Sequence, residues 1–170
     1  LWFIEPEGDV SWTRGVIVWR NTPTPDQIGM ARALMPSVAR MVIDKGLMGL
    51  TMFEILQREF PDKVEGVQFG SANKEAMAVY VKRRMEEGRL RLPDDDLIRY
   101  SFNAIKRTVN AVGQSRFDSE HDEKYGHSDH FWACCLAEMA TQGAGQESDF
   151  QPEWVPPAQN RPEIWRRIGA

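Results

Sequence analysis

Short apolar runs typical of β-strands alternate with helical runs along most of this chain, and this alternation restricts the fold more than any other feature. The sequence predicts a hairpin over residues 1–19, with its turn at residues 6–9, and further strands at residues 40–44 and 63–70. Helices are predicted between them at about residues 25–38, where Pro36 should end the helix early, and 48–60.

The second half continues the same alternation. A helix is predicted over about residues 73–87 and closed by Gly88, followed by a short extended piece in "RLRLP" and a helix that begins in "DDDLIRYSFNAI". "RTVNAVGQSRFD" resembles a hairpin that turns near Gly113, and a last helix is expected from about Ser128 to Thr141. This order of elements favours a mixed α/β fold with helices on the faces of a sheet.

Composition indicates one globular domain. The chain has 170 residues, of which 42% are apolar and 27% charged, and it contains no apolar run of the roughly 20 residues that a membrane span needs. We expect a folded domain over residues 1–142 and a C-terminal tail over residues 143–170, where prolines and two tryptophans lie among polar residues. The chain starts inside a strand-like run and without methionine, so we expect a fragment of a larger protein.

Two cysteines and a modest negative charge exclude some classes of function. Cys134 and Cys135 are adjacent in an apolar helical run, so they are expected to be core residues and not a disulfide or a zinc knuckle. A net charge of −4 argues against indiscriminate nucleic-acid binding but allows a local basic face.

Two aspartates occupy positions suited to a ligand site. Asp44 ends an apolar strand next to a glycine-containing turn, and the carboxyl ends of strands are where open α/β sheets bind ligands. Asp129 lies in the first turn of the last helix, where the helix dipole favours a negative group. Turn formation and helix capping are the structural alternatives for these residues. His127 and His130 flank Asp129, but no matching third and fourth ligand supports a zinc site.

A basic segment lies around the end of the helix predicted over residues 73–87. Its cations have two interpretations: a solvated helix face, since Glu86 and Glu87 lie among them, or contact with nucleic-acid phosphates without sequence readout. The residues are Lys82, Arg83, Arg84, Arg89 and Arg91.

An ordered set of motifs resembles a known family. The motifs are "RMVIDKGLMG", "VEGVQFGSANKEAMAVYVKRRMEEGRLRLPDD", "AIKRTVNAVGQSRFD" and "GHSDHFWACCLA". In this order they resemble the C-terminal nuclease domain of tailed-phage large terminase subunits, particularly those of Mu-like phages and prophages. The resemblance covers about residues 10–140.

The resemblance implies an RNase H-like fold in which acidic residues bind two divalent cations, Mg²⁺ or Mn²⁺, and cut double-stranded DNA. It identifies Asp44 and Asp129 as catalytic metal ligands. His127 and His130, which flank Asp129, are candidates to hydrogen-bond to these ligands. The resemblance also places Lys74 near the site as a DNA contact. The family's first aspartate belongs on a strand that should precede Leu1, so the resemblance implies that this strand is missing from the fragment and that the activity of the fragment depends on it.

The family implies partners and a location as well. The substrate would be concatemeric phage DNA, the protein partners would be a portal protein and a small terminase subunit, and the location would be the cytoplasm of the bacterial host, with no membrane partner. No G-x-x-x-x-G-K-[ST] motif of an ATPase motor occurs in the chain. Two alternatives remain open: a non-catalytic module that grips DNA or docks on the portal, and another RNase H-like nuclease of the resolvase or transposase type.

Overall fold

The structure is a computed structural model that describes residues 1–46, 49–109, 115–118 and 128–142. The first half forms a hairpin of two strands, then a helix with a 3-10 turn, and then a β-α-β unit. In chain order these elements are β1 (Trp2–Glu7), β2 (Val10–Val16), α1 (Thr24–Leu34), η1 (Met35–Ser37), β3 (Met41–Asp44), α2 (Leu50–Glu59) and β4 (Val64–Val67).

The described part of the second half contributes three helices and three short strands. In chain order they are α3 (Ser71–Glu86), β5 (Leu90–Arg91), α4 (Asp96–Asn103), β6 (Lys106–Val109), β7 (Ser115–Asp118) and α5 (Asp129–Gln142). The predicted order of helices and strands is confirmed. Proline and glycine act as expected, because α1 ends at Leu34 just before the 3-10 turn that contains Pro36, and Gly88 adopts a positive φ of 66° after α3.

The strands form three small sheets in the described part of the chain. β1 pairs antiparallel with β2, whose start pairs with β5, while β3 and β4 form a parallel pair and β6 and β7 an antiparallel pair. The mixed α/β character is therefore as predicted, but no described strand joins β1 to β3 into one continuous sheet.

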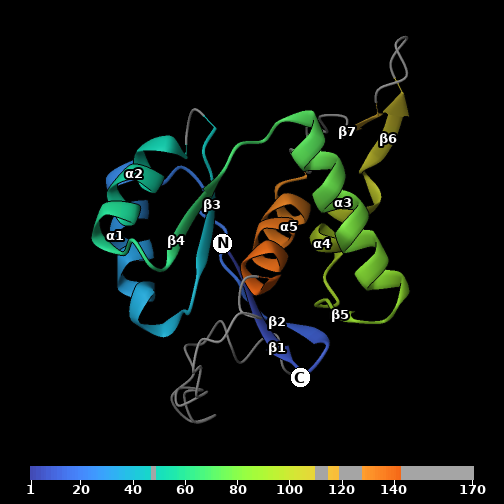
Figure 1. Cartoon of the computed structure of the whole chain (residues 1–170), viewed down its shortest axis with the longest axis horizontal. Coiled ribbons are helices and arrows are strands. Elements are labelled where there is room, and N and C mark those ends of the chain that lie inside the picture. The colour runs from blue at the N-terminus through green and yellow to red at the C-terminus, as the bar shows by residue number, and fades with distance from the viewer. Residues whose placement is uncertain (47–48, 110–114, 119–127, 143–170) are drawn as a thin grey trace.

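Helix α5 connects these parts. Figure 1 shows it in the middle of the molecule, between β3 and β4 on one side and α3 and α4 on the other. It packs against β1, β3, α3 and α4. One apolar cluster forms around α5 and α3, and a second lies between α1, α2 and β3.

The two cysteines lie in the core, as predicted. Cys134 and Cys135 are fully buried in α5, and burial raises the pKa of both thiols, which keeps them protonated. No described helix is long and apolar enough to cross a membrane.

Candidate functional site

Asp44 is the last residue of β3, and a tight glycine turn holds it. The Gly46 N–H donates a hydrogen bond of 2.9 Å to Asp44 Oδ1. The chain returns so closely that a Cβ atom on Gly49 would lie 1.9 Å from the Asp44 carbonyl oxygen. Glycine is therefore required at position 49, and the turn fixes one carboxylate oxygen of a half-buried aspartate.

Asp129 is exposed at the first residue of α5, whose start is anchored from α4. The Phe131 N–H donates to Ser101 Oγ at 3.1 Å, and both Ser101 and the preceding Ser128 are buried. This hydroxyl satisfies a backbone donor that the first turn of a helix leaves unpaired. The carboxylate of Asp129 is thus presented to solvent by a fixed helix start.

Strand β3 and helix α5 run in opposite directions, which puts both aspartates at the same end of the pair. Arg40, just before β3, donates through Nη1 to the carbonyl oxygen of Ala140, near the end of α5, at 3.4 Å. From this contact, Asp44 lies about 13 Å along the strand. Asp129 lies about 16 Å back along the helix. We call the end of the molecule that contains Asp44 and Asp129 the acidic edge.

An aromatic contact also links these two elements. Phe69 follows β4, whose last residue Val67 pairs with Asp44, and its ring centroid lies 5.5 Å from that of Trp132 in the first turn of α5. The ends of β3 and β4 therefore lie next to the start of α5.

Lys74, in the first turn of α3, lies at the acidic edge too. Its Nζ is 4.8 Å from the centroid of the Trp132 ring and 5.8 Å from that of Phe69. Within the described residues Lys74 forms no ion pair, so none of the described carboxylates neutralises its charge.

His130 follows Asp129 and is half-buried. Burial lowers its pKa, an effect that Asp95 and Asp129 oppose and that the amino terminus and Arg20 reinforce. The imidazole is therefore neutral at neutral pH and can accept or donate a hydrogen bond. His127, the other histidine predicted at the site, lies outside the described residues.

The other predicted cations lie at the opposite end of α3, about 15 Å from Lys74 along the helix. Most of them form exposed ion pairs: Lys82 with Glu86, Arg83 with Glu87, and Arg89 with Asp9 and Glu87. Arg91 instead donates to the Gly88 carbonyl oxygen and lies over the ring of Trp12. The structure thus places Lys74 apart from the five cations of the basic segment.

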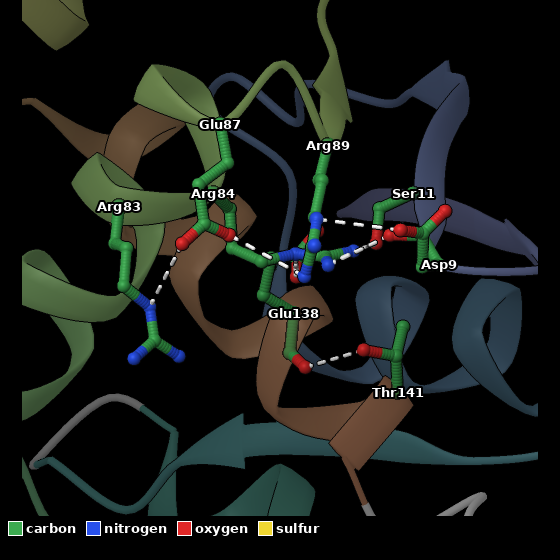
Figure 2. Close-up of polar contacts among 8 residues, drawn as sticks. All are labelled: Asp9, Ser11, Arg83, Arg84, Glu87, Arg89, Glu138 and Thr141. Atoms are coloured by element: carbon green, nitrogen blue, oxygen red, sulfur yellow. Dashed lines mark hydrogen bonds and ion pairs between the residues drawn. The ribbon is translucent and has the colours of Figure 1, made fainter.

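Arg84 differs from its neighbours because it points into the fold (Figure 2). Its Nη atoms donate to the Asp9 carbonyl oxygen and to Ser11 Oγ, both at 2.8 Å, and its Nε lies 3.4 Å from Oε2 of Glu138, which is fully buried in α5. Only 12% of the Arg84 side chain is exposed. The expected phosphate contact does not fit this geometry, and Arg84 instead ties α3 to β2 and α5.

The acidic edge has the chemistry of a partial cation site. Aspartate oxygens are preferred ligands of hard divalent cations, and Asp44 and Asp129 each supply one carboxylate. Among the described residues, no group of three or more histidine, cysteine, aspartate or glutamate side chains could hold a metal ion. Within the described residues, Asp44 and Asp129 are therefore the carboxylates proposed for this edge, with the Lys74 ammonium beside Trp132.

The sequence analysis did not predict that Lys74 contacts the rings of Trp132 and Phe69. It also did not predict the ion pair between Arg84 and Glu138. Trp132 follows Asp129 by three positions, so helical spacing alone could have placed it beside that aspartate. Nothing in the sequence pairs Glu138 with Arg84, because their contact depends on how α3 and α5 pack.

Comparison with known proteins shows which family model the chain matches. Residues 1–141 match the family model described as the terminase RNase H-like domain. No curated protein sequence matches the chain.

Several solved structures share the fold. The large terminase nuclease of thermophilic phage G20c superposes with a TM-score of 0.59 and 18% identity over 82% of this chain and 81% of that chain. The same nuclease with bound cobalt gives 0.60 and 20% over 84% and 81%. The large terminase nuclease domain of Thermus phage P74-26 gives 0.58 and 17% over 89% and 84%. The model match covers most of the chain, and the chain belongs to the family of terminase RNase H-like domains.

Proposed function

We propose that this chain is a metal-dependent endonuclease domain that cuts concatemeric double-stranded DNA during phage DNA packaging. The observation that carries the proposal is the opposed packing of β3 and α5, which puts Asp44, Asp129 and Lys74 at one end of the molecule. Two acidic groups at the ends of separate elements, with the Lys74 ammonium at the same edge, suit the binding of a metal ion and a phosphate.

Asp44 and Asp129 would hold the divalent cation, Mg²⁺ or Mn²⁺. Such an ion, or a pair of them, activates water and stabilises the leaving oxygen of a phosphodiester. The Gly46 N–H orients the Asp44 carboxylate by binding Oδ1, and Oδ2 would bind the cation. The related G20c nuclease has been solved with magnesium and with cobalt, which supports divalent metal use here.

We propose that a third carboxylate comes from a strand that fits between β1 and β3. Each of these strands is at the edge of its sheet in the described part of the chain, and α5 packs against both. Trp2 at the start of β1 packs through Phe102 onto Phe131 near the start of α5, whereas β3 starts beside the end of α5. β1 and β3 therefore run oppositely, so one strand could pair antiparallel with β1 and parallel with β3.

The basic residues divide into a near and a far set with respect to the acidic edge. Lys74 would contact the phosphate that is cut or its neighbour, without reading sequence. Lys82, Arg83 and Arg89 would contact the duplex further along if DNA displaces their carboxylate partners, and Arg91 would contact it beside them.

This far set favours a second candidate function, a DNA-gripping or portal-docking module without catalysis, because its cations lie far from both aspartates. In either case the family implies a portal protein and a small terminase subunit as partners, and the cytoplasm of the bacterial host as the location.

Plasmid nicking tests the proposal. The chain, and a version extended at its N-terminus by about one strand, would be assayed with Mn²⁺ and with EDTA. We expect metal-dependent nicking that Asp44→Asn and Asp129→Asn lower by at least about 100-fold, since loss of even an indirect metal contact costs 10–100-fold. Asp94→Asn is the matched control, because Asp94 is exposed and pairs only with Arg99 among the described residues. Nicking that survives both substitutions would exclude the two aspartates as metal ligands, whereas no nicking by the wild-type chain or by its extended version would favour the gripping module.

A further inference from the structure

Lys74 is held by aromatic rings, in contrast to most cations of α3. Its Nζ faces two rings, those of Trp132 and Phe69. Lys82 instead pairs with Glu86, and Arg83 pairs with Glu87 although it also lies over the Tyr80 ring. A carboxylate partner neutralises an ammonium, but a ring attracts it through its quadrupole and carries no net charge. The aromatic contact can therefore fix the position of Lys74 and leave its full charge for an anion.

The ring that Lys74 contacts most closely is itself fixed. Trp132 is 9% exposed, and its centroid lies 5.1 Å from the Phe131 ring and 5.5 Å from the Phe69 ring in tilted or edge-on arrangements. These contacts come from α5 and from the segment after β4, so the indole joins the start of α5 to a segment that lies next to the end of β3.

Neighbouring carboxylates do not compete for Lys74. Glu75, the next residue, lies 3.8 Å from Arg107 Nη2, and no ion pair of Lys74 is present in the described residues. Among the described residues, Lys74 therefore lies at the same edge as Asp44 and Asp129 without forming an ion pair with either.

We infer that Trp132 is a positioning residue that holds the Lys74 ammonium at the acidic edge, where it binds a phosphate of duplex DNA. This inference rests on the proposed function, because it requires that DNA binds at this edge. Trp132 acts through Lys74 and needs no contact with DNA.

The salt dependence of DNA binding distinguishes this role from simple packing. Each phosphate neutralised by a cation contributes about 0.9 to the slope of log affinity against log salt concentration. We expect Lys74→Met to make the slope shallower by about that amount. Trp132→Leu, which removes no charge, should produce most of the same change, and Trp132→Phe should retain most of the wild-type slope.

The measurement uses a short duplex, EDTA to prevent cleavage and a temperature at which circular dichroism shows every variant to be folded. Phe102→Leu is the matched control, because Phe102 packs on Phe131 in the same cluster but lies over no cation of the described residues, and its slope should be that of the wild type. The double variant Lys74→Met with Trp132→Leu should lose no more slope than Lys74→Met alone. If Trp132→Leu does not fold, the test uses Phe69→Leu and Trp132→Phe in its place. A partial loss of slope is expected in Phe69→Leu, and most of the wild-type slope is expected in Trp132→Phe.

The outcomes separate this inference from the proposed function. A wild-type slope in Trp132→Leu, an equal change in Phe102→Leu, or no change in Lys74→Met overturns the positioning role while DNA binding stands. A wild-type protein that binds no duplex even at low salt overturns the proposed function and the inference together.

Discussion

The two ends of the α3–α5 pair use charge in opposite ways. At the start of both helices, Lys74 rests on Trp132 and Asp129 faces solvent, and neither forms an ion pair within the described residues. Towards their ends, Arg84 and the fully buried Glu138 form an ion pair inside the fold, with Nε 3.4 Å from Oε2. The same two helices thus keep one pair of charges available to a ligand and use the other pair to hold the structure.

This contrast between the two ends indicates which charges belong to the structure and which are available for function. A buried ion pair loses much hydration, and its mutual attraction only partly offsets that loss, so its removal is felt as stability. Exposed charges without an ion-pair partner contribute little to stability, but they remain able to bind a ligand. Substitutions at the two ends should therefore separate loss of stability from loss of binding.

The largest effect is expected at the internal end. Glu138→Ala should lower the free energy of unfolding by about 3–5 kcal/mol, because it leaves the Arg84 guanidinium buried without a counter-charge. Urea denaturation measures this change. Glu86→Ala, which breaks the exposed pair with Lys82, is the control and should cost less than about 1 kcal/mol. A double variant, Arg84→Met with Glu138→Leu, should recover most of the loss, and a cost equal to that of Glu138→Ala would contradict this account of the pair.

The next effect concerns the turn that holds Asp44. Gly49→Ala should cost about 1–3 kcal/mol, since its Cβ would meet the Asp44 carbonyl oxygen at 1.9 Å and force the turn to move. Gly29→Ala is a matched control in α1, where no atom lies within 4 Å of the added Cβ, and it should stabilise the helix by about 0.5–1 kcal/mol. Equal melting temperatures for Gly49→Ala and the wild type would show that the turn relaxes freely.

Two aspartates at helix starts allow a finer comparison. Asp95 accepts hydrogen bonds from the Leu97 and Ile98 amides, so Asp95→Ala should cost about 1 kcal/mol and leave any response to Mn²⁺ intact. Asp129→Ala should leave the melting temperature nearly unchanged without metal, but should remove the stabilisation that a ligand bound only to the native state produces. A melting temperature of Asp129→Ala that falls without metal and still rises normally with Mn²⁺ would make Asp129 a structural residue.

The smallest effect is a dependence of stability on pH, with opposite signs at the two ends. Burial lowers the pKa of His130 below its usual 6.5, so the unfolded chain binds a proton more readily and stability falls as pH drops below 6.5. Burial raises the pKa of Glu138 above its usual 4.5, an effect that Ser11 and Arg84 oppose. Here the native state binds the proton more readily, so stability falls as pH rises from 4.5 to the raised pKa. The free energy of unfolding should be measured against pH. In His130→Asn its fall below pH 6.5 should disappear, and in Glu138→Gln its fall above pH 4.5 should disappear. An unchanged pH dependence in these variants would contradict both assignments.

Local chemistry made the fold largely predictable from the sequence. Pro36 removes a backbone donor and fixes φ, so the end of α1 was foreseen, and the apolar run before Asp44 is too short for a helix. The boundaries of α2 and α3 differ from the prediction by two residues or fewer because helix ends depend on local capping. Predictions for His127 and the tail over residues 143–170 lie outside the described residues and stay predictions.

The candidate site was only partly predictable. Asp44 and Asp129 stood out because each ends or begins an element, but their placement at one end depends on the direction in which α5 packs on β3. The basic segment was expected to act as one group. Whether a helix residue faces solvent or the core depends on what packs against the helix, and so Arg84 is buried although Arg83 beside it is exposed.

The sequence by itself determined where the helices and strands lie, that the two cysteines are in the core, and which residues have charges suited to metal and phosphate. Hydrogen-bonding limits, side-chain volume and apolar periodicity act over a few residues, so they can be read along the chain. Only the tertiary structure decided that Lys74 rests on Trp132 and that Arg84 meets Glu138. Those pairings join residues that are far apart in sequence, and the packing of α3 against α5 selects them by excluding water from one end and leaving the other open.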